Sequence, residues 1–215
     1  MGGRKMNWKD RQEVAARTLG DLLRRTREMS LRVPVVPAIF SSLRIAASPL
    51  LLFFVGISPM PRAAFWTALF AAFTDYADGW FARRLHCKTY GGKILDFTAD
   101  KIFLMVALLS MASAGYMDAT VAGVITGYHL LVIMAITVVS WSLSTPVVPV
   151  PTGERLVVTL SYVLVVSVAG ARAFPEKGIY STLAWVGGVL TLVSLLLGAV
   201  GYLRLIRRIL GRYRR

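Results

Sequence analysis

The sequence predicts an all-α integral membrane protein with six transmembrane helices, preceded by an amphipathic helix on the cytoplasmic side. Its 215 residues are 56% hydrophobic and have a mean hydropathy of +0.61, which is far more apolar than a soluble domain. Apolar stretches of about 20 residues, long enough to cross a bilayer, recur along the chain. Lys and Arg gather in every second connection between these stretches, as the sidedness of membrane proteins requires.

Residues 1–32 are mostly polar and are expected to form the N-terminal helix as a separate unit. Trp8, Ala15, Leu19 and Leu22 recur at helical spacing, with charged side chains on the other faces. This pattern is typical of a helix that lies along the cytoplasmic surface of the membrane. A fully solvated helix is the alternative that the same pattern allows.

The membrane domain is expected over residues 33–205, followed by a basic cytoplasmic tail at 206–215. Roughly thirty mostly polar residues precede the first apolar stretch, so it does not resemble a cleavable signal peptide. The prolines of Ser144–Arg155 cannot continue a helix, so this segment is expected to be a cytoplasmic loop. The six predicted spans are Pro34–Ile57, Arg62–Leu85, Lys93–Tyr116, Ala119–Leu143, Leu156–Ala173 and Gly178–Leu203.

The basic residues predict the orientation of these spans. With six spans both termini share one side, and that side holds the nine Lys/Arg before Pro34 and the six arginines from Arg204 onward. The opposite side keeps only Arg62, Arg172 and Lys177. The termini are therefore expected in the cytoplasm, with the protein in a bacterial inner or plasma membrane. The net charge of +14 is explained by basic residues that set the membrane orientation and bind anionic lipid headgroups. No nucleic-acid partner is expected.

Four aspartates lie where apolar spans two and three begin or end. A charged side chain inside a span costs a few kcal/mol, so each needs a partner or a function. Asp75 and Asp78 are three residues apart and Asp96 and Asp100 four apart, so each pair lies on one helical face. The polar link 83–92 predicts an antiparallel hairpin, in which Asp75 is at the depth of Asp100 and Asp78 at the depth of Asp96. The two pairs are expected to face each other near the headgroup layer.

This arrangement of carboxylates predicts a metal site. Four carboxylates at one depth cannot all be ionised without cations between them. Oxygen ligands without His or Cys favour Mg²⁺ or Mn²⁺, and two such ions about 4 Å apart are a common device for displacement at phosphorus. Gly79 and Ala82 keep the Asp75 face small enough for a nucleobase, and Gly92 does the same at the start of span three. Arg83 and Thr89 lie where they could bind phosphate or ribose.

These residues resemble the signature of the CDP-alcohol phosphotransferase family. In this sequence it reads Asp75-x₂-Asp78-Gly79-x₂-Ala82-Arg83-x₈-Gly92-x₃-Asp96-x₃-Asp100. So many fixed positions would co-occur by chance on the order of once in 10¹⁰ windows. The resemblance implies the family's six-span fold and transfer of a phosphatidyl or phosphoalcohol group from a CDP-linked donor to a hydroxyl acceptor, with CMP leaving.

The resemblance also implies roles for individual residues and a homodimer. Asp100 matches the family's proton acceptor, and two divalent ions are expected per site. The matching metal ligands are Asp75, Asp78, Asp96 and Asp100. The positions expected to contact the CDP donor are Ser41, Asp78, Gly79, Ala82, Arg83, Thr89 and Gly92.

A second resemblance lies in span one, over Val36–Phe53. It is similar to the opening of the phosphatidylglycerophosphate and cardiolipin synthase branch, with Pro37, Ser41 and Arg44 at matching positions and Ala38 in place of an Asn. The implied reaction is an in-line attack of the acceptor hydroxyl on the β-phosphorus of CDP-diacylglycerol, without a covalent intermediate.

The acceptor alcohol stays open at this stage, with glycerol 3-phosphate as the first choice. A phosphorylated acceptor needs a cationic pocket, for which Arg44 and Arg155 are the candidates. Span four contains no Arg or Lys, although phosphatidylglycerophosphate synthases usually carry an arginine there. Phosphatidylglycerol, inositol phosphate and serine are the alternatives with the same chemistry.

Intramembrane acids also occur in cation and proton transporters, which is the alternative from another class. A transport pathway would explain the carboxylates but not the glycines and Arg83 at fixed offsets. His129 in span four is expected to be a hydrogen-bonded core histidine rather than a ligand.

Overall fold

The computed structural model describes residues 35–84, 90–142 and 151–213, and every regular element in these ranges is helical. The predicted N-terminal helix at 1–32 lies outside the described residues. The helices are α2 (Val35–Leu52), α3 (Pro61–Arg84), α4 (Tyr90–Ser113), α5 (Ala119–Ser142), α6 (Thr152–Ala173) and α7 (Ile179–Tyr213), and α2 continues into the π-helical turn η1 (Phe53–Ile57).

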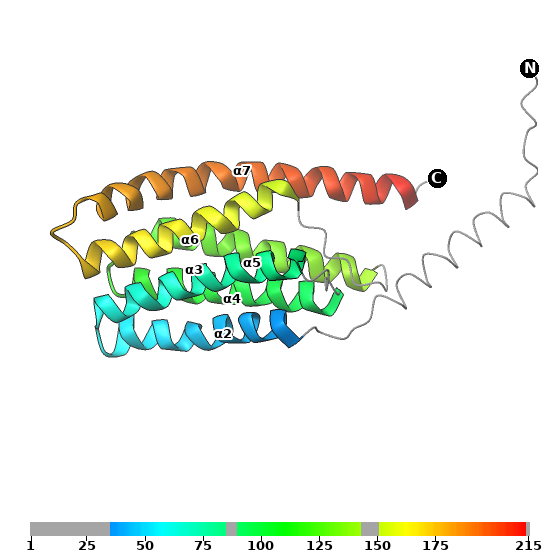
Figure 1. Cartoon of the computed structure of the whole chain (residues 1–215). Helices are drawn as coiled ribbons and strands as arrows, with labels where there is room; N and C mark the ends of the chain where they lie inside the picture. The colour runs from blue at the N-terminus through cyan, green and yellow to red at the C-terminus, as the bar shows by residue number, and fades with distance from the viewer. Residues whose placement is uncertain (1–34, 85–89, 143–150, 214–215) are drawn as a thin grey trace, which may run out of the picture.

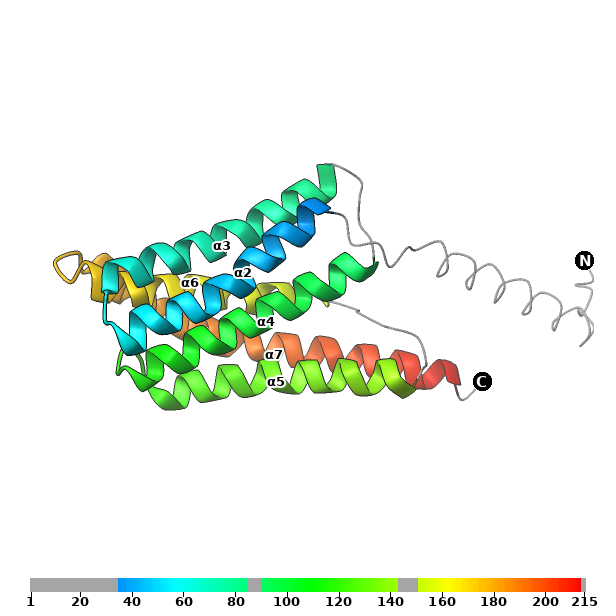
Figure 2. The ribbon, with the colours of Figure 1, turned by 90° about the horizontal axis from the view of Figure 1, so that it is seen from below.

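The helices run along one common direction as an elongated bundle (Figure 1). Helix α6 packs along α7, and α2 packs on both α3 and α4. Helices α3 and α4 pack little against each other, and Figure 2 shows α2 between them. The prediction that spans two and three face each other directly is therefore incomplete, because a third helix contributes to the space between them.

Short turns at one end of the bundle fix the helix ends. Gly115 has a φ of 70°, and its N–H and that of Tyr116 return to the carbonyls of Ala112 and Met111 at 3.0 and 2.8 Å, which closes α4 with a Schellman motif. Asp118 caps α5 by accepting hydrogen bonds from the N–H groups of Thr120 and Val121 at 2.8 and 3.1 Å. These bonds favour the carboxylate and hold the pKa of Asp118 below its ordinary value.

Within the described residues, four helices are long and apolar enough to cross a membrane. These stretches are Ile39–Ile57, Ala119–Val138, Gly153–Ala173 and Ile179–Arg204. Helices α3 and α4 have 24 residues each, the same length as α5, but they carry the aspartates and are less apolar. Large apolar side chains such as Trp185, Leu196 and Leu131 are 79%, 69% and 66% exposed, which a membrane environment explains and water does not. The chain is an integral membrane protein.

The core between the helices uses small side chains where backbones approach. Ala64, Ala68 and Ala71 on α3 are fully buried, and small residues of this kind allow close packing of membrane helices. Larger buried side chains from α4, such as Phe103 and Leu104, fill the centre.

Two helix boundaries differ from the prediction. Helix α6 begins at Thr152 rather than Leu156. The preceding Pro151 does not prevent this, because the N–H that proline lacks would have no partner within the helix at that position. Glu154 and Arg155 are therefore helical rather than part of a loop. Helix α7 continues to Tyr213, so the basic residues expected in a separate tail extend the last helix up to that residue.

Candidate active site

Three of the four predicted carboxylates come together in the structure. Asp75 from α3 and Asp96 and Asp100 from α4 each offer an oxygen, and these atoms lie within 4.8 Å of one another. The four-residue spacing puts Asp96 and Asp100 on the same face of α4, one turn apart. The side chain of Asp78 lies outside the described ones.

Arg44 from α2 lies among these carboxylates. Its Nη1 donates to Oδ1 of Asp96 at 3.1 Å and to Oδ1 of Asp100, and its Nη2 is 3.6 Å from Oδ1 of Asp75. The arginine is fully buried, and its Nε and Nη2 have no hydrogen-bond partner in the described part of the chain. Arg44 therefore explains how three acids from two helices can be held at one point in an apolar bundle.

The donor set fits a hard divalent cation. All ligands are carboxylate oxygens, as Mg²⁺ and Mn²⁺ prefer. Three carboxylates against one guanidinium leave two negative charges uncompensated when all are ionised, and one divalent ion would balance them. The residues present therefore fit a divalent metal ion.

Tyr162 from α6 also contacts the cluster. Its hydroxyl donates to Oδ1 of Asp100 at 3.3 Å, and its ring stacks on Phe103 with centroids 5.7 Å apart and an interplanar angle of 13°. Sequence reasoning missed this residue, because a tyrosine in an apolar span resembles ordinary packing. Only the pairing of α4 with α6 brings it to Asp100.

A second buried polar cluster adjoins the first. Lys101 donates to Oε1 of Glu154, and its Nζ is 3.0 Å from Nδ1 of His129. The Tyr128 hydroxyl donates to Oε2 of Glu154 at 2.6 Å. His129 is thus buried and hydrogen-bonded, as predicted. Lys101 follows the candidate ligand Asp100 directly in the sequence, but its ion pair is with Glu154.

The remaining predicted site residues are distributed as follows. Ser41 is buried one helical turn before Arg44, and its Oγ has no hydrogen-bond partner among the described residues. Arg155 is exposed at the start of α6, and both oxygens of the adjacent Glu154 are engaged by other residues. The side chains that lie outside the described ones are Asp78, Gly79, Ala82, Arg83, Thr89 and Gly92.

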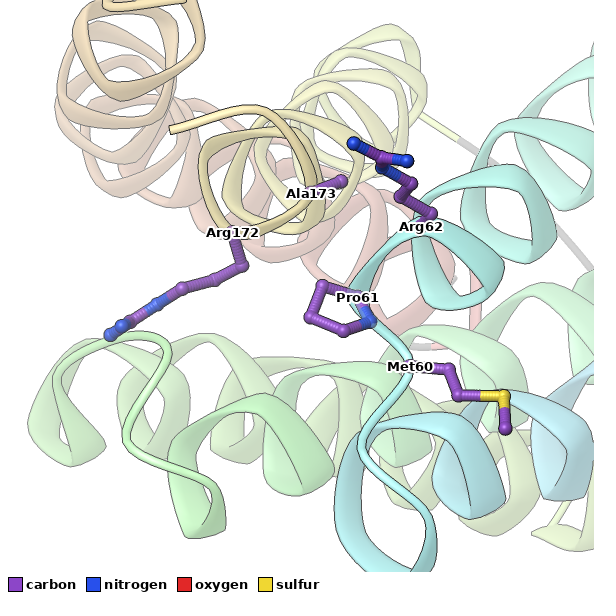
Figure 3. A pocket seen from close by; sticks show the side chains of 5 residues that line it. All are labelled: Met60, Pro61, Arg62, Arg172 and Ala173. Atoms are coloured by element: carbon purple, nitrogen blue, oxygen red, sulfur yellow. The ribbon is translucent and has the colours of Figure 1, made fainter. Parts of the chain in front are cut away.

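A separate hollow of about 300 Å³ lies far from the carboxylates. It is lined by Met60, Pro61, Arg62, Arg172 and Ala173, where α3 begins and α6 ends (Figure 3). Asp75 lies thirteen residues beyond Arg62 along α3, which is about 20 Å at 1.5 Å per residue. Arg172 donates to the carbonyl of Gly115 at 2.5 Å. No carboxylate lines this hollow, so it is not the candidate site.

Comparison with known proteins identifies relatives of the chain. The family described as CDP-alcohol phosphatidyltransferase matches residues 34–199. A CDP-diacylglycerol–glycerol-3-phosphate 3-phosphatidyltransferase of Aquifex aeolicus is 44% identical over 75 residues, which are 35% of this chain and 42% of that protein. The enzyme of the same name from Pseudomonas fluorescens is 40% identical over 76 residues, 34% of this chain and 39% of that protein.

A fusion protein of Schizosaccharomyces pombe, named cardiolipin synthase (CMP-forming) / mitochondrial hydrolase, is 29% identical over 102 residues, 47% of this chain and 17% of that protein. The chain thus aligns with about two fifths of the length of the two bacterial relatives and less of the yeast protein.

Proposed function

Because the chain belongs to the CDP-alcohol phosphatidyltransferase family, we propose that it transfers a phosphatidyl group from CDP-diacylglycerol to a hydroxyl acceptor and releases CMP. The observation that carries this proposal is the meeting of Asp75, Asp96 and Asp100 around Arg44, within the region that the family matches. A cluster of oxygen ligands with a net negative charge is suited to a metal-bound diphosphate.

The metal ligands in this proposal are Asp75, Asp78, Asp96 and Asp100, holding two ions of Mg²⁺ or Mn²⁺. When bound, the ions neutralise charge on the diphosphate and on the departing oxygen of CMP. Arg44 holds Asp96 and Asp100 in place from α2.

Asp100 is the general base of the proposed reaction. Arg44 and Tyr162 both donate to its Oδ1, so we assign Oδ2 to accept the proton of the acceptor hydroxyl. The acceptor oxygen forms a bond to the β-phosphorus as the bond from that phosphorus to the oxygen of CMP breaks. Geometry matters more than basicity for such a carboxylate, because it needs only to reach the hydroxyl.

The donor is proposed to bind beside Ser41 and along the residues that end α3 and begin α4. The buried Oγ of Ser41 lies one turn from Arg44 on the same helix and has no hydrogen-bond partner in the described ranges, which leaves it available to a ligand. The other proposed donor contacts are Asp78, Gly79, Ala82, Arg83, Thr89 and Gly92.

Glycerol 3-phosphate is the proposed acceptor. The Aquifex and Pseudomonas relatives carry this acceptor in their names, and the exposed Arg155 at the start of α6 could bind its phosphate. Phosphatidylglycerol is the second candidate, since the yeast relative is named a cardiolipin synthase. All three relatives are enzymes by name, so the transporter alternative gains no support.

The proposed setting is a six-span protein with both termini and the site on the cytoplasmic side of a bacterial inner membrane. Helices α3 and α4 have 24 residues each, as α5 has, and lie alongside the more apolar helices in the bundle, which favours six spans over four. We propose that the protein forms a homodimer, as the family resemblance implies.

The test is an acceptor panel. Purified protein is incubated with CDP-diacylglycerol, Mg²⁺ and one of glycerol 3-phosphate, phosphatidylglycerol, inositol phosphate or serine, and CMP and the lipid product are measured for each. CMP release that depends on glycerol 3-phosphate is the expected result. CMP release with another acceptor would keep the reaction and replace the acceptor, and no release with any of them would refute the proposal.

A further inference from the structure

The four residues Lys101, Tyr128, His129 and Glu154, named here the Lys101 network, join three helices next to the candidate active site. Lys101 and Glu154 form an ion pair between α4 and α6, and α5 contributes Tyr128 and His129. Lys101, His129 and Glu154 are no more than 1% exposed. The network is therefore a closed polar contact inside the bundle, separate from the contacts of Arg44.

Stability alone does not account for a buried ion pair. Desolvation of the two charges can exceed their attraction, and apolar side chains of similar volume often serve a fold as well or better. In an apolar bundle such a pair is costly enough to indicate a function. The proposed reaction assigns these four residues no role, so their position has to be explained separately.

The position of Lys101 suggests the role. It follows Asp100 directly, and successive residues of an α-helix point about 100° apart around the axis. Asp96 and Asp100 contact Arg44 on α2, whereas Lys101 contacts α5 and α6. The ion pair therefore fixes the rotation of α4 about its own axis at the residue next to the proposed base.

Two further contacts restrict the rotation of α4 and the position of Glu154. Tyr162, eight residues after Glu154 on α6, donates to Asp100 itself, so α6 holds two successive residues of α4. The Tyr128 hydroxyl lies against Gly198 of α7, where an added Cβ would overlap it. Glu154 thus has both oxygens engaged by groups that are themselves held in place.

We propose that Glu154, through its ion pair with Lys101, is a positioning residue that orients Asp96 and Asp100 toward the metal ions and the acceptor hydroxyl. The expected change in kcat rests on the proposed function, whereas the expected change in metal affinity does not. Residues that orient metal ligands from outside typically change metal affinity or activity about 10- to 100-fold when replaced.

The experiment separates positioning from stability by comparing Lys101→Met, Glu154→Gln and the double variant Lys101→Met/Glu154→Met. Each single variant leaves a buried group without its partner and should lower Tm. The double variant removes both charges and should recover a Tm within about 5 °C of the wild type. Its kcat should nevertheless stay at least about 10-fold low with the donor KM unchanged. Glu176→Gln, at an exposed acid in the turn before α7, is the matched control and should behave as the wild type.

A second measurement does not depend on catalysis. Mn²⁺ titration followed by electron paramagnetic resonance should give a Kd about 10-fold higher in the double variant. Wild-type kcat and wild-type Mn²⁺ affinity in a stable double variant would overturn the inference, since Glu154 would then be structural only. If the wild type releases no CMP, the proposed function fails, and the Mn²⁺ titration still decides whether Glu154 positions the carboxylates.

Discussion

Replacement of Arg44 by Gln tests how the three carboxylates are held together without a metal. In the structure the guanidinium contacts Asp96 at 3.1 Å and Asp75 at 3.6 Å, and it also donates to Asp100. The variant leaves three acids facing one another with no cation among their described partners. Breaking a buried charge pair costs about 3–5 kcal/mol. For a chain of about 200 residues each kcal/mol is about 2–4 °C, so Tm in EDTA should fall by about 6–20 °C.

Divalent metal should reverse much of this loss. A ligand at 100 times its Kd stabilises the folded state by about 2.7 kcal/mol, or about 5–11 °C on the same scale. Because Arg44→Gln carries one more uncompensated negative charge than the wild type, its gain in Tm from Mg²⁺ should exceed that of the wild type. The assay is thermal unfolding in detergent, followed by tryptophan fluorescence, with EDTA or Mg²⁺ in excess.

Arg62→Gln is the matched control, since Arg62 is exposed on α3 and its guanidinium contacts only the ring of Phe174 among the interactions described, 5.9 Å from its centroid. Its effect should stay within about 1 kcal/mol, as for an exposed cation–π contact. An Arg44→Gln variant with the Tm of this control in EDTA, or with no larger gain from Mg²⁺ than the wild type, would refute the reasoning.

Three further substitutions test the proposed roles of single residues. Asp100→Asn should lower kcat by about 10²- to 10⁴-fold, the usual contribution of a general base, and should leave donor binding unchanged. A kcat within about tenfold of the wild type would show that Asp100 is not the base. Gly79→Leu should abolish CDP-diacylglycerol binding in an equilibrium binding assay while membrane insertion is normal, and an unchanged donor affinity would move the nucleotide elsewhere. Arg155→Ala should raise the acceptor KM and leave the donor KM unchanged, because a guanidinium binds phosphate in a bidentate way; equal small changes in both KM values would make Arg155 a lipid anchor only.

Contacts along one helix or across one hairpin could be predicted from the sequence. The four-residue spacing of Asp96 and Asp100 fixes their common face, and the hairpin predicted from the polar link 83–92 gives the depth of Asp75 relative to them. The structure brings these three residues together within 4.8 Å. The apolar stretches of about 20 residues also predict an all-helical membrane protein, and every regular element among the described residues is helical.

Contacts between helices distant in sequence could not be predicted in the same way. From the sequence, Arg44 is only a candidate for the acceptor phosphate, because nothing in span one shows which neighbour it faces. In the structure its contacts are with the three carboxylates. An arginine inside a span needs an acidic partner, and a search for that partner beyond the hairpin would have suggested the pairing.

Glu154 was missed for a different reason. The prolines before it placed the residue in a predicted loop, whereas α6 begins at Thr152 and buries it. Its pairing with Lys101 depends on α4 and α6 lying side by side, and a pattern within one span does not contain that information. An acid and a lysine in two separate spans are a signal only when the helix packing is known.

The measurement that tests the central claim most directly is the metal dependence of CMP release. Purified protein receives CDP-diacylglycerol and glycerol 3-phosphate, and CMP is followed first in EDTA and then after excess Mg²⁺ or Mn²⁺ is added. A carboxylate site that binds the diphosphate through divalent ions predicts no release in EDTA and full release once either metal is restored. Release of CMP at the same rate in EDTA would contradict the account.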